Sequence, residues 1–381
     1  MKRSSVVIVV CVALVIVFFA WSYRISDTPE SAVPNSNGGV IISASAPGMA
    51  INKSPAASVT ERPKAPLKRQ EVFAGGMLAM ADPSLVGMSQ TDLAARFDLI
   101  ATTGAVGVRF DLFWRDIETT KGVYQWAKYE RIALEAQKRH VPLLAILDYA
   151  PAWASPAGCD GQVIRCAPEN MATFAQFAED AAAHFVPLGV HYYELWNEPN
   201  LIGVWHPKPN AADFASLVRQ ACPRIKLVDP QAFVVTGGLG LGDTPGDVPM
   251  AAFAQQFLAA SPGDCFDAVG VHLYGPSAWG QLSLVRTAMV GSGQDHKNIW
   301  ATEVGAPTSG ACGATDNESE ARQANTLASD VATWRSYPWV GPLFWSIPVD
   351  VPARKNYYGL FCADGTPKPS LSVFAELAKV S

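Results

Sequence analysis

The stretch His191-Tyr-Tyr-Glu-Leu-Trp-Asn197-Glu198-Pro199-Asn200 is the most informative part of the chain. It begins as a short apolar and aromatic run, which is typical of a buried strand, and ends in an amide, a carboxylate and a proline. Because Pro199 lacks a backbone donor and restricts the residue before it, the strand should stop at Glu198. This places Asn197 and Glu198 at the C-terminal end of a strand. A strand-ending turn with an incidental glutamate is the alternative.

Similar strand-like runs recur along the chain and alternate with amphipathic, helix-like stretches. The eight runs cover residues 72–80, 105–111, 142–148, 191–197, 233–238, 267–274, 298–303 and 341–347, and helix-like stretches include 91–102, 128–139 and 320–335. Eight strand–helix units without a long insertion predict an α/β fold, a single (β/α)8 TIM barrel over residues 71–381. A doubly wound open sheet is disfavoured because no Gly-rich phosphate loop follows the first run.

A second carboxylate ends a strand-like run in Asn298-Ile-Trp-Ala-Thr-Glu303. In a barrel of this kind catalytic groups lie at the C-terminal ends of different strands. Cleavage of a glycosidic bond needs two carboxyl groups that face each other across the bond. We therefore predict Glu198 and Glu303 as the catalytic residues of a glycosidase. Their separation should be about 5–5.5 Å for a retaining mechanism and about 6.5–9.5 Å for an inverting one.

Three further polar residues lie in predicted strands near these carboxylates. Arg109 interrupts the apolar run Val106-Gly-Val-Arg109-Phe-Asp111, and a buried arginine needs an anion. We expect that anion to be Glu303, with Asp111 or Asp148 as the alternative. His272 and Tyr274 are two residues apart, so both should point into the barrel. We expect Tyr274 to hydrogen-bond the nucleophile and His272 to tune the acid.

Tryptophans at the predicted strand ends are candidates for sugar binding, because the apolar face of a sugar ring stacks well on an indole. Trp345 lies in the eighth strand, and Trp153 and Trp205 follow the third and fourth strands. We expect Trp345 to form the floor of the sugar site and the other two to line further subsites. Core packing is the alternative for each of them.

The cysteines predict three disulfides in an exported protein. Six remain after Cys11, and loop placement favours the pairs Cys159–Cys166, Cys222–Cys265 and Cys312–Cys362. The chain contains no C-x₂-C spacing and no histidine cluster, so we predict no metal site.

The N-terminal region predicts export and membrane attachment. Residues 1–23 hold an unbroken apolar run behind Lys2 and Arg3, typical of a signal peptide or a signal anchor, and retention as an anchor is favoured over cleavage. Residues 24–70 are rich in Pro and Ser and predict a flexible, disordered linker. The domain would then be periplasmic or extracellular. A net charge of −5 argues against a nucleic-acid partner.

Taken together, these motifs resemble the retaining glycoside hydrolases of clan A, and are most similar to family 39 and related cellulase-like proteins. The similarity rests on Trp196-Asn-Glu-Pro199, Thr302-Glu-Val-Gly305, His272-x-Tyr274, Arg109 and Trp345. The resemblance implies that Glu198 is the acid/base and Glu303 the nucleophile, while Asn197 holds the sugar 2-hydroxyl and Trp345 is the platform. We expect a monomeric enzyme for a carbohydrate substrate, with β-linkages favoured and no cofactor. A non-catalytic glycan-binding barrel tethered at the cell surface is the alternative.

Overall fold

Eight parallel strands close into a barrel in the computed structural model, which describes residues 73–159, 165–310, 312 and 317–380. The strands are β1 (Leu78–Ala81), β2 (Val108–Phe113), β3 (Leu143–Asp148), β4 (Tyr192–Asn197), β5 (Phe233–Gly238), β6 (Ala268–Leu273), β7 (Asn298–Val304) and β8 (Val340–Ser346). Consecutive strands pair in parallel, and β1 pairs with β8 from Leu78↔Leu343 to Ala81↔Ser346. The predicted (β/α)8 TIM barrel is confirmed, because an open sheet would leave β1 and β8 unpaired.

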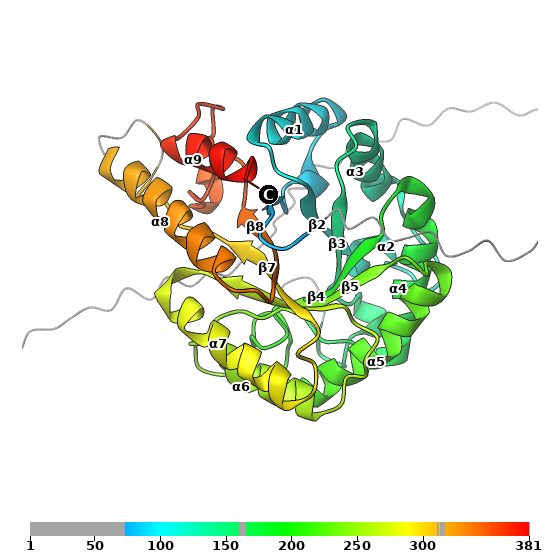
Figure 1. Cartoon of the computed structure of the whole chain (residues 1–381). Helices are drawn as coiled ribbons and strands as arrows, with labels where there is room; N and C mark the ends of the chain where they lie inside the picture. The colour runs from blue at the N-terminus through cyan, green and yellow to red at the C-terminus, as the bar shows by residue number, and fades with distance from the viewer. Residues whose placement is uncertain (1–72, 160–164, 311, 313–316, 381) are drawn as a thin grey trace, which may run out of the picture. The chain divides into compact units, whose positions relative to one another are not determined.

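Helices follow the strands and surround the barrel, as Figure 1 shows. They are α1 (Gln90–Thr103), α2 (Trp114–Ile117), α3 (Ala127–Lys138), α4 (Met171–Phe185), α5 (Ala211–Val228), α6 (Met250–Ala259), α7 (Gly275–Gly291), α8 (Asn317–Arg335) and α9 (Pro369–Ala378). Side chains fix several helix starts: the Asn170 and Asn210 oxygens accept backbone N–H groups of α4 and α5. Gly104, with φ of 79°, ends α1 in the left-handed conformation that glycine tolerates.

The N-terminal end of the barrel is filled by aromatic side chains. Phe73 packs edge-on against Tyr192 at 4.8 Å between ring centroids and lies 5.5 Å from Trp300 and from Phe344. All four are buried. This end is therefore a packed apolar core, and polar groups are left for the opposite, C-terminal rim, where sites form in this fold.

Three disulfides join the cysteines in the predicted pairs. Cα separations are 6.3 Å for Cys159–Cys166, 5.9 Å for Cys222–Cys265 and 5.7 Å for Cys312–Cys362. All lie within the range that a disulfide can span. The first closes the loop after β3, the second ties α5 to the segment before β6, and the third joins the segments that follow β7 and β8. The disulfide prediction is confirmed.

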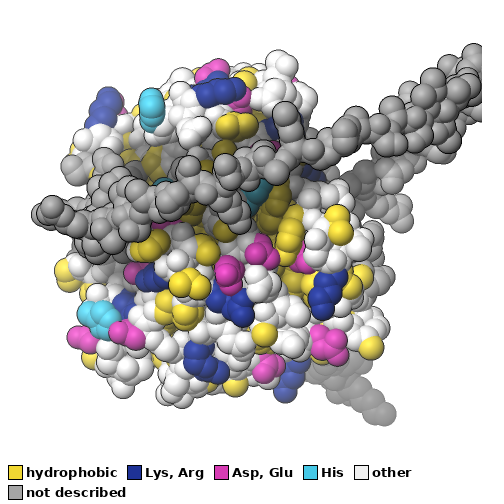
Figure 2. All heavy atoms as spheres, turned by 90° about the vertical axis from the view of Figure 1, so that its right-hand side faces the viewer, with side chains coloured by type: hydrophobic (Ala, Val, Ile, Leu, Met, Phe, Trp, Pro, Cys, Tyr) yellow, Lys and Arg dark blue, Asp and Glu magenta, His cyan; other side chains and the backbone are white. Residues whose placement is uncertain are grey.

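The predicted membrane segment 1–23 and linker 24–70 lie outside the described residues. Within the described ranges no helix has the length and apolar character needed to cross a bilayer. On the face seen in Figure 2, acidic and basic side chains are interspersed with scattered apolar ones.

Candidate active site

Glu198 and Glu303 come together at the C-terminal rim around one imidazole. His272, on β6, places Nδ1 3.0 Å from Glu198 Oε1 and 3.7 Å from Glu303 Oε2. His272 is buried, whereas both glutamate side chains are 23% exposed. The two carboxylates, which are far apart in the sequence, therefore border the same small space and are open to solvent from it.

The end of β4 has an irregular backbone that brings Asn197 and Glu198 to this space. Trp196 and Glu198 adopt positive φ values of 71° and 44°, which are uncommon for residues other than glycine. Leu195 and Trp196 both pack into the outer core, so the usual alternation of side chains is interrupted. The backbone N–H of Glu198 still donates to Gly238 O at 3.0 Å, which fixes it against β5. Strained backbone of this kind clusters at functional sites.

Glu303 receives two hydrogen bonds that favour its ionised form. Arg109 Nη1 lies 2.5 Å from Oε1, and the Tyr274 hydroxyl donates to Oε2 at 2.7 Å. Burial opposes ionisation, but the charges of His272 and Arg109 and the Tyr274 bond outweigh it and lower the pKa of Glu303 to about 2. For His272, burial disfavours the cation, but the Glu303 charge and the Glu198 contact outweigh it and raise its pKa.

Arg109 forms a second ion pair with a buried carboxylate, Glu194, which was not predicted from the sequence. Its Nε lies 2.5 Å from Glu194 Oε2, so in the described part of the chain it forms ion pairs with both Glu194 and Glu303. The other oxygen of Glu194 accepts the backbone N–H of Gly238 at 2.9 Å and the Thr302 hydroxyl at 2.8 Å. Glu194 is completely buried inside an apolar run. That placement was the available signal, because a buried glutamate needs a cation.

Asn197 lies between Arg109 and a second missed residue, Tyr149, which follows β3. Asn197 Oδ1 accepts from Arg109 Nη2 at 3.0 Å, and Asn197 Nδ2 donates to the Tyr149 hydroxyl at 3.1 Å. The amide therefore links Arg109, which also contacts Glu303, to the hydroxyl of Tyr149. The only available signal for Tyr149 was weak: it is an aromatic residue directly after an aspartate that ends a predicted strand.

The three tryptophans predicted for sugar binding differ in exposure. Trp345 is completely buried on the outer side of β8 and donates its indole N–H to Tyr358 O at 3.0 Å. Trp205 is 1% exposed and packs edge-on against Trp196. Neither presents a ring face at the rim, which corrects the expectation of a platform at Trp345 and a subsite at Trp205. Trp153 is half-buried and donates to Glu118 O at 2.7 Å.

Trp345 instead acts on the site indirectly, through the residues that contact Glu303. Its indole N–H donates to the backbone carbonyl of Tyr358. The Tyr358 ring packs edge-on against that of Tyr274, with 5.6 Å between the ring centroids. Tyr274 in turn donates to Glu303. Trp345 thus contributes to the position of the aromatic pair beside this carboxylate.

Comparison with known proteins identifies the family of the chain. The family model described as glycosyl hydrolase catalytic core matches residues 123–374. The chain belongs to this family. The resemblance predicted from the motifs is thereby confirmed, and family 39 proteins are among the solved structures similar to this glycosyl hydrolase core. No curated protein sequence matches the chain.

Solved structures share the fold of the glycosyl hydrolase core. A family 39 glycoside hydrolase from Bacteroides cellulosilyticus is 24% identical, with a TM-score of 0.62 over 81% of this chain and 64% of that one. A GH39 β-xylosidase from Caulobacter crescentus is 18% identical, with a TM-score of 0.62 over 84% and 73%. A GH5_18 protein from Streptomyces cattleya, solved with GlcNAc, is 16% identical, with a TM-score of 0.60 over 81% and 80%. The chain thus spans somewhat less than two thirds of the Bacteroides protein.

Two buried aspartates, Asp111 on β2 and Asp148 at the end of β3, lie on neighbouring strands of the barrel. Both oxygens of Asp148 are buried without a hydrogen-bond partner in the described residues. Burial, reinforced by the charge of Asp111, raises the pKa of Asp148 well above its usual range. Burial also raises the pKa of Asp111 to about 6, although Arg109 opposes the shift. Burial without a hydrogen-bond donor thus favours the protonated form of Asp148 over the ionised one.

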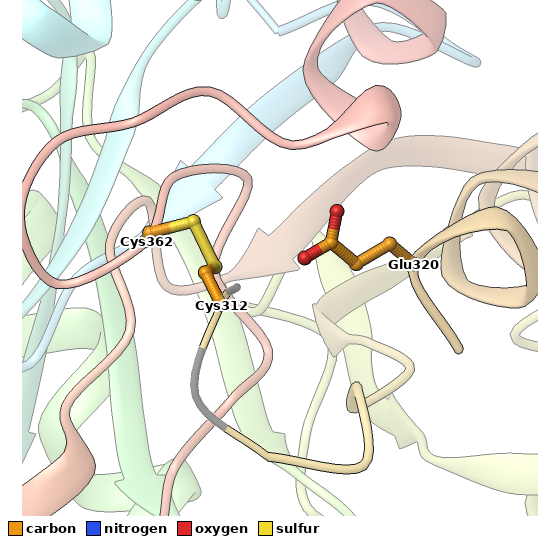
Figure 3. A group of neighbouring side chains, drawn as sticks. All are labelled: Cys312, Glu320 and Cys362. Carbon is orange, nitrogen blue, oxygen red and sulfur yellow. A yellow bond between two sulfur atoms is a disulfide. The ribbon is translucent and has the colours of Figure 1, made fainter. Parts of the chain in front are cut away.

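One group in the glycosyl hydrolase core has the geometry of metal ligands, although its chemistry does not fit a metal. Cys312, Glu320 and Cys362 place ligand-type atoms within 4.8 Å of one another, the single such group of three in the described residues. Figure 3 shows the two sulfurs joined to each other, with the Glu320 carboxylate beside them. Metals bind the thiolate, which a disulfide does not offer. The residues therefore form a disulfide next to a carboxylate.

Proposed function

We propose that the protein is a retaining glycosidase that cleaves O-glycosidic bonds, with β-linked ones favoured, in a polysaccharide or oligosaccharide. Glu198 is the acid/base and Glu303 the nucleophile. The observation that carries the proposal is the pair of half-buried carboxylates around His272, of which Glu303 is held ionised by Arg109 and Tyr274. Membership of the glycosyl hydrolase family supports the same reaction class.

The spacing of the carboxylates supports retention over inversion. Because both contact His272 Nδ1, the two contacting oxygens of Glu198 and Glu303 are at most about 6.7 Å apart, the sum of the two distances. Retaining enzymes hold their carboxyl groups about 5–5.5 Å apart, and inverting enzymes leave about 6.5–9.5 Å for a water molecule. The bound reaches only the lower edge of the inverting range and includes the whole retaining range, which favours direct attack by a carboxylate.

The electrostatics support the division of roles. A nucleophile must be ionised, and a general acid must carry a proton at the working pH. Glu303, with its pKa lowered to about 2 by His272, Arg109 and Tyr274 against the opposing effect of burial, is suited to the first role. Glu198 contacts the imidazole of His272, a group that can itself carry or release a proton. It is therefore the better candidate for proton transfer.

The reaction then proceeds in two displacements. Glu303 attacks the anomeric carbon while Glu198 gives its proton to the glycosidic oxygen, so the C–O bond breaks and the leaving sugar departs as an alcohol. Glu198, now a carboxylate, takes a proton from water, whose oxygen attacks the same carbon and releases Glu303. Arg109, His272 and Tyr274 position the carboxylates, and Asn197 and half-buried Trp153 contact the sugar. No cofactor takes part in these steps.

We also propose that the enzyme acts outside the cytoplasm as a membrane-tethered monomer. The three disulfides support an oxidising compartment, because such bonds rarely persist in the cytosol. The apolar run in residues 1–23 supports the tether. Fractionation of cells that express the full chain tests this proposal, which predicts recovery with membranes and release after truncation of residues 1–70.

Replacement of each carboxylate by alanine tests the assigned roles. Glu198→Ala should slow cleavage of a β-glycan by about 10²–10⁴-fold, because its leaving alkoxide needs a proton. An activated aryl β-glycoside leaves without that help, and azide should restore turnover because it needs no general base. Glu303→Ala should abolish both reactions, since no glycosyl-enzyme can form.

A matched control is Glu135→Ala, which removes a buried carboxylate from α3, where it pairs with Lys138 and Arg139. It should keep the activity of the parent. Equal losses for the Glu198 and Glu303 variants on both substrates, without azide rescue, would contradict the assignment. Binding of glycans by the parent without any turnover would favour the non-catalytic glycan-binding alternative.

A further inference from the structure

We infer that Tyr149 is a positioning residue that orients the amide of Asn197. Through this amide, Tyr149 controls how tightly the enzyme binds the substrate oxygen on the carbon next to the anomeric carbon. The inference rests on the proposed function, in which Glu303 attacks the anomeric carbon. Asn197 precedes Glu198 in the chain and shares Arg109 with Glu303. If Glu303 attacks the anomeric carbon, an amide that shares Arg109 with Glu303 lies close enough to bind the oxygen on the neighbouring ring carbon.

The hydrogen bonds of Asn197 define its orientation completely. An asparagine amide can turn over with little change of shape, so its neighbours must select which end is oxygen. Arg109 can only donate, and it therefore selects the oxygen on its side at 3.0 Å. The Tyr149 hydroxyl accepts one N–H on the other side at 3.1 Å. The second N–H has no acceptor in the described residues and is available for a ligand oxygen.

Tyr149 is itself held in a strained and closely packed position. Its φ of 58° lies in the left-handed region, which costs a non-glycine residue about 1–3 kcal/mol. Its ring stacks on Phe113 at 5.7 Å, meets Trp196 edge-on at 5.9 Å and lies 4.8 Å from the Arg165 guanidinium. Contacts on several sides leave the hydroxyl little freedom. A strained backbone persists only where the surrounding contacts hold it in place. Here those contacts place the Tyr149 hydroxyl against Asn197.

A purely structural role for Tyr149 makes a different prediction. If the hydroxyl only satisfies a buried N–H, its loss should lower stability and affect all substrates alike. If it orients Asn197, its loss should matter only when the substrate has an oxygen for that amide. The two roles therefore separate in substrate dependence.

The test compares Tyr149→Phe with the parent on a dinitrophenyl β-glycoside and on its 2-deoxy analogue. The sugar is the one cleaved best in a panel of glucoside, xyloside, galactoside and mannoside. Removal of the 2-hydroxyl should cost the parent about 100-fold in kcat/KM. Tyr149→Phe should lose about tenfold on the 2-hydroxy substrate, mainly in kcat, and less than twofold on the 2-deoxy one.

Two further variants make the result specific. Tyr193→Phe removes another fully buried hydroxyl, which donates to Val190 O at 2.8 Å, and should leave both substrates unaffected. In an Asn197→Ala background, the Tyr149 substitution should have no further effect, whereas independent roles would give multiplied losses. Thermal unfolding of each variant establishes that it is folded.

The outcomes distinguish this inference from the proposed function. Equal losses on both substrates, no loss on either, or independence of Tyr149 and Asn197 would overturn the positioning role while the glycosidase assignment stands. An absence of turnover by the parent on the whole panel would overturn the proposed function, and the inference with it.

Discussion

Replacement of Glu194 by glutamine tests whether a buried carboxylate holds the cation at the floor of the site. Glu194 is fully buried and accepts from Arg109 Nε at 2.5 Å, Gly238 N at 2.9 Å and the Thr302 hydroxyl at 2.8 Å. A glutamine oxygen can keep the last two bonds, but its NH₂ group would then face the Arg109 N–H. Removal of one partner from a buried ion pair costs about 3–5 kcal/mol. Because Arg109 keeps Glu303, we expect about 3 kcal/mol.

Urea unfolding measures this loss. With an m-value of about 3 kcal/mol/M, which should not change, the midpoint should fall by about 1 M. Glu118→Gln is a matched control, because Glu118 is also buried but, among the described residues, accepts from the Trp114 indole and the Gly122 backbone and not from a charged side chain. It should cost about 1 kcal/mol, as for a neutral hydrogen bond. If Glu194→Gln loses no more stability than Glu118→Gln, Arg109 does not depend on Glu194.

Two further predictions concern protonation. Tyr274→Phe removes a donor to Glu303, so the pKa of that carboxyl should rise from about 2, and the acid limb of kcat/KM should move to higher pH; an unchanged limb would show that the bond does not stabilise the nucleophile. Because burial raises the pKa of Asp148, the native state is stabilised less as pH rises above about 4. Asp148→Asn should therefore raise the thermal midpoint at pH 7 more than at pH 4, and a gain independent of pH would contradict this.

The fold could be predicted because its signals are local. Each strand of a parallel barrel is buried on both faces and appears as a short apolar run, and Pro199 marks the end of one such run. The two carboxylates could be predicted for the same reason, since each closes a run. The disulfide pairs followed from loop placement: Cys159 and Cys166 share one loop, Cys312 and Cys362 follow neighbouring strands of a closed barrel, and Cys222 and Cys265 remained.

Side-chain direction within a strand was less predictable. When both faces are apolar, alternation does not reveal which residues face inward, and so Trp345 was expected at the rim although Phe344 and Ser346 alternate with it on the inner side. Tyr149 was missed because its place depends on a positive φ that the sequence does not signal. Glu194 was missed for a different reason: its charge stood within a run interpreted as apolar.

The covalent intermediate provides the most direct test of the central claim, that Glu303 attacks the sugar. The parent enzyme is incubated with the 2-deoxy-2-fluoro dinitrophenyl β-glycoside of its preferred sugar, which slows release of the glycosyl-enzyme, and is then digested and examined by mass spectrometry. We expect one fluorosugar per chain, attached to the peptide that contains Glu303, and no label on Glu303→Ala. Label on another residue, or turnover of the parent substrate with inversion and no labelled peptide, would contradict the account.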